Sequence, residues 1–209
     1  MADSTVFWYA SRATGIVALL LLTAVFAIGI AVSRQVKVPG LPRFAVTDLH
    51  RNLSLLAVAF LAVHVLTAVL DTYVSIPVLA IVIPFASGYE RFWLGLGAVA
   101  FDLMLAMIVT SLVRARMNRI AWRGVHLTVY LSWPVAFLHS IYSSGDLRHG
   151  PLLDLAVGCA LVLAAAVAWR LVSAARQLPR SRRVAAQLSR AYRARQAGPT
   201  RPTPPRTTR

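Results

Sequence analysis

Four of the five histidines in this 209-residue sequence lie in two apolar stretches, where ionisable side chains are costly. His50 and His64 lie in the first stretch, and His126 and His139 lie in the second. If both stretches are membrane helices that run in the same direction, His50 and His126 share one depth, and His64 and His139 share another. At about 1.5 Å of rise per residue, the two depths are about 20 Å apart.

Two imidazoles at one depth suit a particular kind of ligand. Imidazole binds iron, copper, zinc and nickel, but zinc needs four protein ligands, or three and a water. A haem supplies four nitrogens itself and needs only two axial ligands. We therefore expect two b-type haems, with His50, His64, His126 and His139 as the axial ligands of the iron. The alternative is that these histidines have a structural role or bind a transported metal.

The composition indicates which elements hold these residues. Hydrophobic residues make up 58% of the chain, whereas soluble domains contain about 45–50%. The chain has 22 Lys and Arg residues against 7 Asp and Glu, for a formal net charge of +15, and one cysteine. These values exclude a disordered chain and a disulfide scaffold, and they argue against a soluble nucleic-acid binder. The sequence predicts an integral membrane protein without a nucleic-acid partner.

Five runs with few or no charges approach the length of about 20 residues that a membrane-spanning helix needs. They lie between Arg12 and Arg34, between Arg51 and Asp71, and over 92–113, 124–142 and 152–173. We expect an all-α membrane fold, a five-helix bundle with two stacked bis-histidine haem sites between its second and fourth helices. A further apolar stretch, 73–85, contains Pro77 and Pro84 and is short. We expect that stretch to lie in the outer membrane interface.

The basic residues predict the orientation of the helices, because cytoplasmic loops are rich in Lys and Arg. The first loop, the third loop and the tail after Ser173 carry most of them, and the second and fourth loops carry one each. We therefore expect an extracytoplasmic N-terminus over 1–12, a transmembrane domain over 13–173 and a cytoplasmic arginine-rich tail over 174–209. The tail is predicted to be amphipathic over 182–196 and disordered from Gly198.

The two histidines of the first stretch fall on nearly the same face of a helix, whereas the two histidines of the second stretch do not. Fourteen residues return His64 to within about 40° of the His50 face, whereas thirteen residues place His139 about 140° from His126. Pro134 lies between the latter two. Because proline bends or re-phases a helix, we expect Pro134 to help bring both histidines to the same side.

Other charged residues near the histidines have candidate roles. Arg12, Arg51 and Arg123 are expected to contact haem propionates, which are anions; the alternative is that they extend to the membrane interface. Asp102 lies inside the third predicted span. It either accepts a hydrogen bond from a ligand imidazole or stays protonated and bonds across the bundle.

The spacing and surroundings of the histidines resemble a known family. His50–x13–His64 in HRNLSLLAVAFLAVH and His126–x12–His139 in WRGVHLTVYLSWPVAFLH look like the ferric reductase-like transmembrane domain. FWYASRATG and VTSLVRARMNRIAWR are similar to its bacterial members, and the resemblance covers about residues 6–145. The family includes ferric reductases, NADPH oxidases and the haem-binding subunit of the bacterial periplasmic methionine sulfoxide reductase system. The resemblance implies two b-type haems that move electrons outward across a bacterial-type plasma membrane.

The sequence departs from the larger members of that family, which carry a domain for FAD and a nicotinamide. No glycine motif that cradles phosphate is present. The chain therefore resembles the stand-alone haem subunits, which take electrons from a separate reductase or from quinol. Such proteins pass electrons to an extracytoplasmic flavin- or metal-cofactor protein. A quinol-dependent ferric or metal reductase that acts alone is an alternative, so enzymatic activity of the chain by itself is left open.

Overall fold

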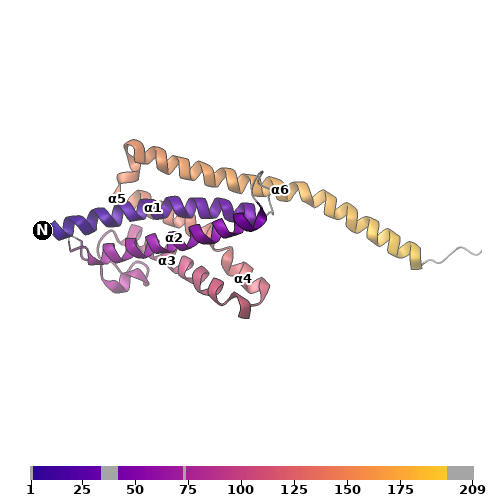
Figure 1. The fold of residues 1–209 in the computed structure, drawn as a ribbon, viewed down its shortest axis with the longest axis horizontal. Coiled ribbons are helices and arrows are strands. Elements are labelled where there is room, and N and C mark those ends of the chain that lie inside the picture. Colours follow the sequence, from indigo (N-terminus) through magenta and orange to yellow (C-terminus); the bar gives the residue numbers. More distant parts are fainter. Residues whose placement is uncertain (1, 34–41, 73, 197–209) are drawn as a thin grey trace, which may run out of the picture. The chain divides into compact units, whose positions relative to one another are not determined.

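The computed structural model describes residues 2–33, 42–72 and 74–196, and every regular element in these ranges is helical (Figure 1). The α-helices are α1 (Ala2–Ser33), α2 (Arg43–Leu70), α3 (Arg91–Leu112), α4 (Arg119–His126), α5 (Val129–Ser144) and α6 (Gly150–Gln196). Short 3₁₀ helices are η1 (Val78–Ile81), η2 (Arg114–Arg116) and η3 (Asp146–Arg148). The predicted all-α class is confirmed for the part of the chain that the structure describes.

The chain divides into two compact units, Met1–Ala166 and Val167–Arg209. In the first unit, α1 packs chiefly along α2, and α3 packs along α5. Smaller contacts join α1 to α5 and α3 to α4. The second unit consists, in its described part, of the C-terminal portion of α6, so the predicted amphipathic stretch 182–196 is helical. The stretch predicted to be disordered from Gly198 lies outside the described residues, and the domain boundaries at 12 and 173 stay predictions.

Four helical segments are long and apolar enough to cross a membrane, which makes the chain a multi-pass membrane protein. They are Thr5–Ser33, Arg43–Leu70, Arg91–Leu112 and Gly150–Arg176. They correspond to the first, second, third and fifth predicted spans. In their most apolar windows, 28% of the residues or fewer are buried within the protein. Most residues in these windows therefore retain some exposed surface, as contact with lipid requires.

The fourth predicted span, 124–142, is divided between α4 and α5. The hydroxyl of Thr128 donates to the Val125 carbonyl at 2.7 Å, and its backbone N–H donates to the same oxygen at 2.9 Å. These bonds compete with the regular helical pattern and end α4 at His126. The segment is therefore interrupted at Leu127 and Thr128, whereas Pro134 lies inside α5. That Pro134 helps bring both histidines to the same side stays a prediction.

Whether α5 crosses the membrane stays a prediction, because this helix is short. This helix has 16 residues, a length of about 24 Å against about 30 Å of hydrocarbon. The five-helix count is therefore not established by the described residues.

The stretch that precedes α3 contributes none of the four candidate spans. After Pro77 it forms only the single turn of η1, and Phe85 adopts a positive φ of 65°. The Phe85 ring fills the space beside Gly95, where a Cβ would overlap it. This contact fixes the stretch against α3. Its predicted place in the outer interface is untested, and Tyr73 lies outside the described residues.

A buried hydrogen bond connects α5 to α1. The Trp133 indole N–H donates to the Thr23 hydroxyl at 3.0 Å, and both side chains are buried. We expect Thr23→Val to lower the free energy of unfolding by about 1–2 kcal/mol, because it leaves the indole N–H without an acceptor. Thermal unfolding in detergent, compared with Trp133→Phe and the double variant, measures the coupling. A double variant whose loss equals the sum of the single losses would contradict this link.

The orientation can be tested by labelling single cysteines in intact cells, after Cys159→Ala removes the native thiol. We expect a membrane-impermeant maleimide to label His149→Cys and to leave Ala115→Cys unlabelled. Both positions are exposed, and the arginines around Ala115 favour the cytoplasm. The opposite labelling pattern would mean that the second and fourth loops face the cytoplasm.

Candidate functional site

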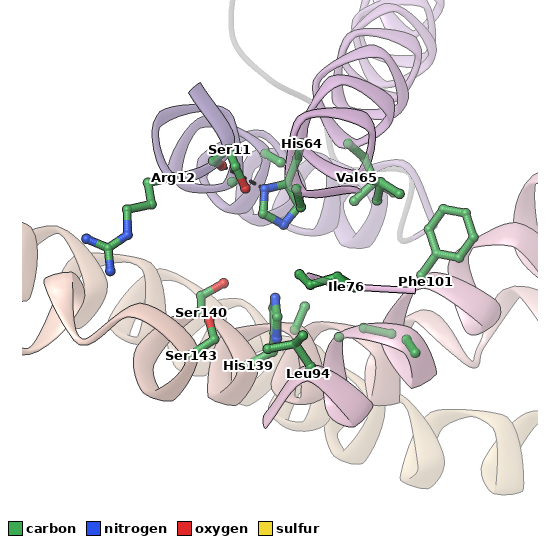
Figure 2. A pocket seen from close by; sticks show the side chains of 18 of the residues that line it. Ser11, Arg12, His64, Val65, Ile76, Leu94, Phe101, His139, Ser140 and Ser143 are labelled. Carbon is green, nitrogen blue, oxygen red and sulfur yellow. Dashed lines mark hydrogen bonds between the residues drawn. The ribbon is translucent and has the colours of Figure 1, made fainter. Parts of the chain in front are cut away.

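The structure brings His64 of α2 and His139 of α5 together. Their ring centroids are 6.3 Å apart and their planes are inclined by 71°. Both rings line a cavity of about 250 Å³, whose other lining residues come mainly from α1, α2, α3, α5 and the segment between α2 and α3. Figure 2 shows the two imidazoles facing one another across this space. We call these two residues the outer pair, after the membrane depth that the sequence predicts for them.

Each imidazole of the outer pair is held by a backbone carbonyl on a different helix. His64 Nδ1 lies 2.7 Å from the Ser11 oxygen, and His139 Nδ1 lies 2.9 Å from the Trp93 oxygen. A carbonyl only accepts hydrogen bonds, so Nδ1 carries the proton in both rings. In the neutral imidazole, Nε2 is then unprotonated and its lone pair can bind a metal.

The second pair, His50 and His126, is arranged differently; we call it the inner pair. His50 lies on α2, and His126 is the last residue of α4. Within the described residues, the buried Nδ1 atom of each ring has no hydrogen-bond partner. The inner pair therefore lacks the carbonyl contacts that orient the outer pair.

His126 is held by an aromatic contact. Its ring stacks on Trp122 with centroids 4.8 Å apart and planes inclined by 21°. The Arg114 guanidinium carbon lies 4.5 Å from the centroid of the Trp122 ring. Stacking fixes the plane of the imidazole but supplies no acceptor for a ring N–H.

The charged residues predicted around the sites have different positions. Arg12 lines the cavity of the outer pair, forms an ion pair with Asp146 at 3.1 Å and lies 3.7 Å above the Trp8 ring. Arg51 and Arg123 are exposed. Contact between any of these arginines and a haem propionate stays a prediction.

The structure also limits the role of Asp102. Its carboxylate accepts a hydrogen bond from none of the four Nδ1 atoms, since two of them bind backbone carbonyls and the other two have no partner among the described residues. Orientation of a ligand ring by Asp102 is therefore not seen.

Several neighbours of the histidines were not identified from the sequence. The carbonyls of Ser11 and Trp93 carry no side-chain signal, and Trp8 and Trp122 match the ordinary pattern of interfacial aromatics. Gly15 and Gly29 did offer a signal, because their separation equals that of His50 and His64.

The donor set within the described residues favours a group that brings its own metal ligands. No group of three or more His, Cys, Asp and Glu side chains that could hold a metal ion occurs there. Paired imidazoles in an apolar bundle supply two ligands, and a bare zinc ion would lack the others. A haem needs only these two.

The helices and the paired histidines define an all-helical, multi-pass membrane protein with opposed imidazoles inside its bundle. A family model for the ferric reductase-like transmembrane component matches residues 14–137, more than half of the chain, and the chain belongs to this family. The match includes His50, His64 and His126 and ends two residues before His139. No curated protein and no solved structure matches the chain.

Family membership indicates a role in redox chemistry or electron transfer within the membrane. Domains of this family generally bind haem. The family match alone does not specify the number of haems, their ligands or the redox partners.

Proposed function

We propose that the chain holds two b-type haems and conducts electrons across the membrane. His64 and His139 are the axial ligands of the outer haem, and His50 and His126 are those of the inner haem. The observation that carries the proposal is the outer pair, whose rings face each other with Nδ1 protonated and Nε2 available.

The separation of the outer pair supports this assignment. An imidazole nitrogen binds a metal at about 2 Å and lies about 1 Å from its own ring centroid, so an atom midway between two such ligands separates the centroids by about 6 Å. The observed separation is 6.3 Å. A direct hydrogen bond between the rings does not explain this arrangement, since both protons are donated to carbonyls.

The protein groups contribute orientation and electrostatics. The hydrogen bonds to Ser11 and Trp93 hold each imidazole in one tautomer and raise its basicity as a ligand. The cavity is lined mostly by apolar side chains, and Arg12, which pairs with Asp146, also lines it. A haem bound between such ligands accepts and releases a single electron.

For the direction of flow, we propose a cytosolic reductase or quinol as donor and an extracytoplasmic redox protein as acceptor. Arg116, Arg119 and Arg123 are exposed near His126 in the chain. They form a positive surface that suits an acidic donor protein. His64 and His139 lie at the other end of the predicted path, from which electrons would leave.

The haem number is tested by the reduced-minus-oxidised absorption spectrum and a haem assay per chain. We expect two haems per chain in the unaltered protein and one in His64→Ala and in His139→Ala, because each variant removes an axial ligand of the outer haem only. His149→Ala, at an exposed position in the fourth loop, is the matched control and should retain two. A single haem in the unaltered protein that survives both ligand substitutions would contradict the outer assignment.

Donor dependence is tested by the rate of haem reduction in the purified chain. We expect no reduction by NADPH alone, because the sequence contains no nucleotide-binding glycine motif. Addition of a flavin reductase or of quinol should reduce both haems. His50→Ala should block delivery from the reductase to the outer haem. Direct reduction by NADPH without a partner would contradict the proposed role, and quinol-driven reduction of ferric chelate by the chain alone would favour a self-sufficient reductase.

A further inference from the structure

Three glycines lie where neighbouring helices meet the histidine rings. A Cβ at Gly15 would lie 2.9 Å from both Cε1 and Nδ1 of His64, and one at Gly97 would lie 2.7 Å from the same two atoms of His139. A Cβ at Gly29 would lie 3.1 Å from Cε1 of His50. Carbon atoms normally approach to about 3.5–4.0 Å. Each ring therefore occupies space that the methyl group of an alanine would need.

The same geometry explains which carbonyls hold the outer pair. Ser11 precedes Gly15 by four residues, and Trp93 precedes Gly97 by four. The side chain of a helical residue covers the turn that precedes it. Since glycine has no side chain, the carbonyl four residues earlier is open to a partner from the side. The imidazole enters this opening and donates its Nδ1 proton there.

A glycine also lies beside a histidine ring at the inner pair, again between α1 and α2. Gly15 and Gly29 are fourteen residues apart, as are His50 and His64. Gly15 meets His64 and Gly29 meets His50, so α1 and α2 are antiparallel and in one register. The inner contact is looser, with Nδ1 of His50 3.7 Å from the Cβ position of Gly29. Among the described residues Nδ1 of His50 has no hydrogen-bond partner, so the ring does not bond to the Val25 carbonyl four residues before Gly29.

His126 lacks this arrangement. Counting thirteen residues forward from Gly97 on α3 and thirteen back from His139 reaches Thr110 and His126. The Thr110 hydroxyl donates to the Ala106 carbonyl at 2.7 Å, which is the oxygen that a glycine at this position would expose. Thr110 thus stands where the spacing would place a glycine, and the His126 ring stacks on Trp122.

We propose that Gly15, Gly29 and Gly97 are positioning residues for His64, His50 and His139. Each glycine makes room for an imidazole ring beside its helix. At Gly15 and Gly97 the ring also reaches the backbone carbonyl four residues earlier, which accepts a hydrogen bond from Nδ1 and so directs Nε2 into the haem site. The identity of the ligand rests on the proposed function, whereas the tautomer and orientation of the rings are properties of the chain itself.

The first test introduces a methyl group at each glycine in the full-length purified protein. Gly15→Ala and Gly97→Ala should weaken retention of the outer haem by about 10-fold or more, measured as haem transfer to an excess of apomyoglobin. The low-spin electron paramagnetic resonance signal of the outer haem should shift, because it depends on the orientation of the axial imidazoles. Gly29→Ala should have a smaller effect, confined to the inner haem, since its Cβ has more room.

Two matched substitutions separate positioning from general packing. Gly158→Ala on α6 meets no atom within 4 Å and should leave both haems unchanged. Gly95→Ala on α3 disturbs the Phe85 ring and none of the histidines, so it reports the effect of a packing defect near the site. Unchanged haem signals in Gly15→Ala and Gly97→Ala, or an equal loss in Gly95→Ala, would overturn the proposal.

A second readout does not depend on haem. In protein labelled with ¹⁵N-histidine and prepared without haem, nuclear magnetic resonance should show His64 and His139 with the proton on Nδ1. Gly15→Ala should convert His64 alone to a mixture of tautomers. A proton on Nε2 in the unaltered protein would overturn the proposal. Absence of haem from the unaltered protein would instead contradict the proposed function, and the tautomers would still decide the role of the glycines.

Discussion

An imidazole N–H in hydrocarbon needs an acceptor within the protein, because no water is present to supply one. In a helix the backbone carbonyls are already bonded along the chain, but each retains a second lone pair. The outer pair uses this capacity at Ser11 and Trp93. These two hydrogen bonds constrain the position of α1 against α2 and of α3 against α5, because each carbonyl and ring must lie within bonding distance. With Nδ1 bound to a carbonyl, each ring also has its Nε2 atom in a defined direction.

The outer and inner histidine pairs differ because the outer imidazoles have acceptors for their Nδ1 protons and the inner ones have none among the described residues. At the outer level, both rings are bound to carbonyls on neighbouring helices. At the inner level, His50 lies beside a looser opening and His126 rests on Trp122. The break at Leu127 and Thr128 separates His126 from the rigid part of α5. Among the described residues, the inner rings thus lack the Nδ1 hydrogen bonds that orient the outer rings.

The sequence predicted the features that depend on composition along a single helix. Runs without charge revealed the four candidate spans, and the spacing of the histidines predicted the opposition of His64 and His139. Features that depend on contacts between helices were not predictable in this way. The Ser11 carbonyl is chemically like any other carbonyl until α2 is placed against it, and Arg12 pairs with Asp146, 134 residues away. The break at Leu127 and Thr128 was not predicted, because hydropathy does not reflect a hydrogen bond from the Thr128 hydroxyl to the backbone.

The shared spacing of Gly15 and Gly29 with His50 and His64 has a consequence for how such chains diverge. A one-residue insertion between the two glycines would turn one of them by about 100° and shift it by about 1.5 Å relative to the other. No insertion in α1 alone is then compatible with both contacts, and a compensating insertion in α2 would change the spacing of His50 and His64 relative to that of His126 and His139. Between the two contacts, residues of α1 and α2 that face lipid can be substituted, whereas the number of residues that separates the contacts cannot change.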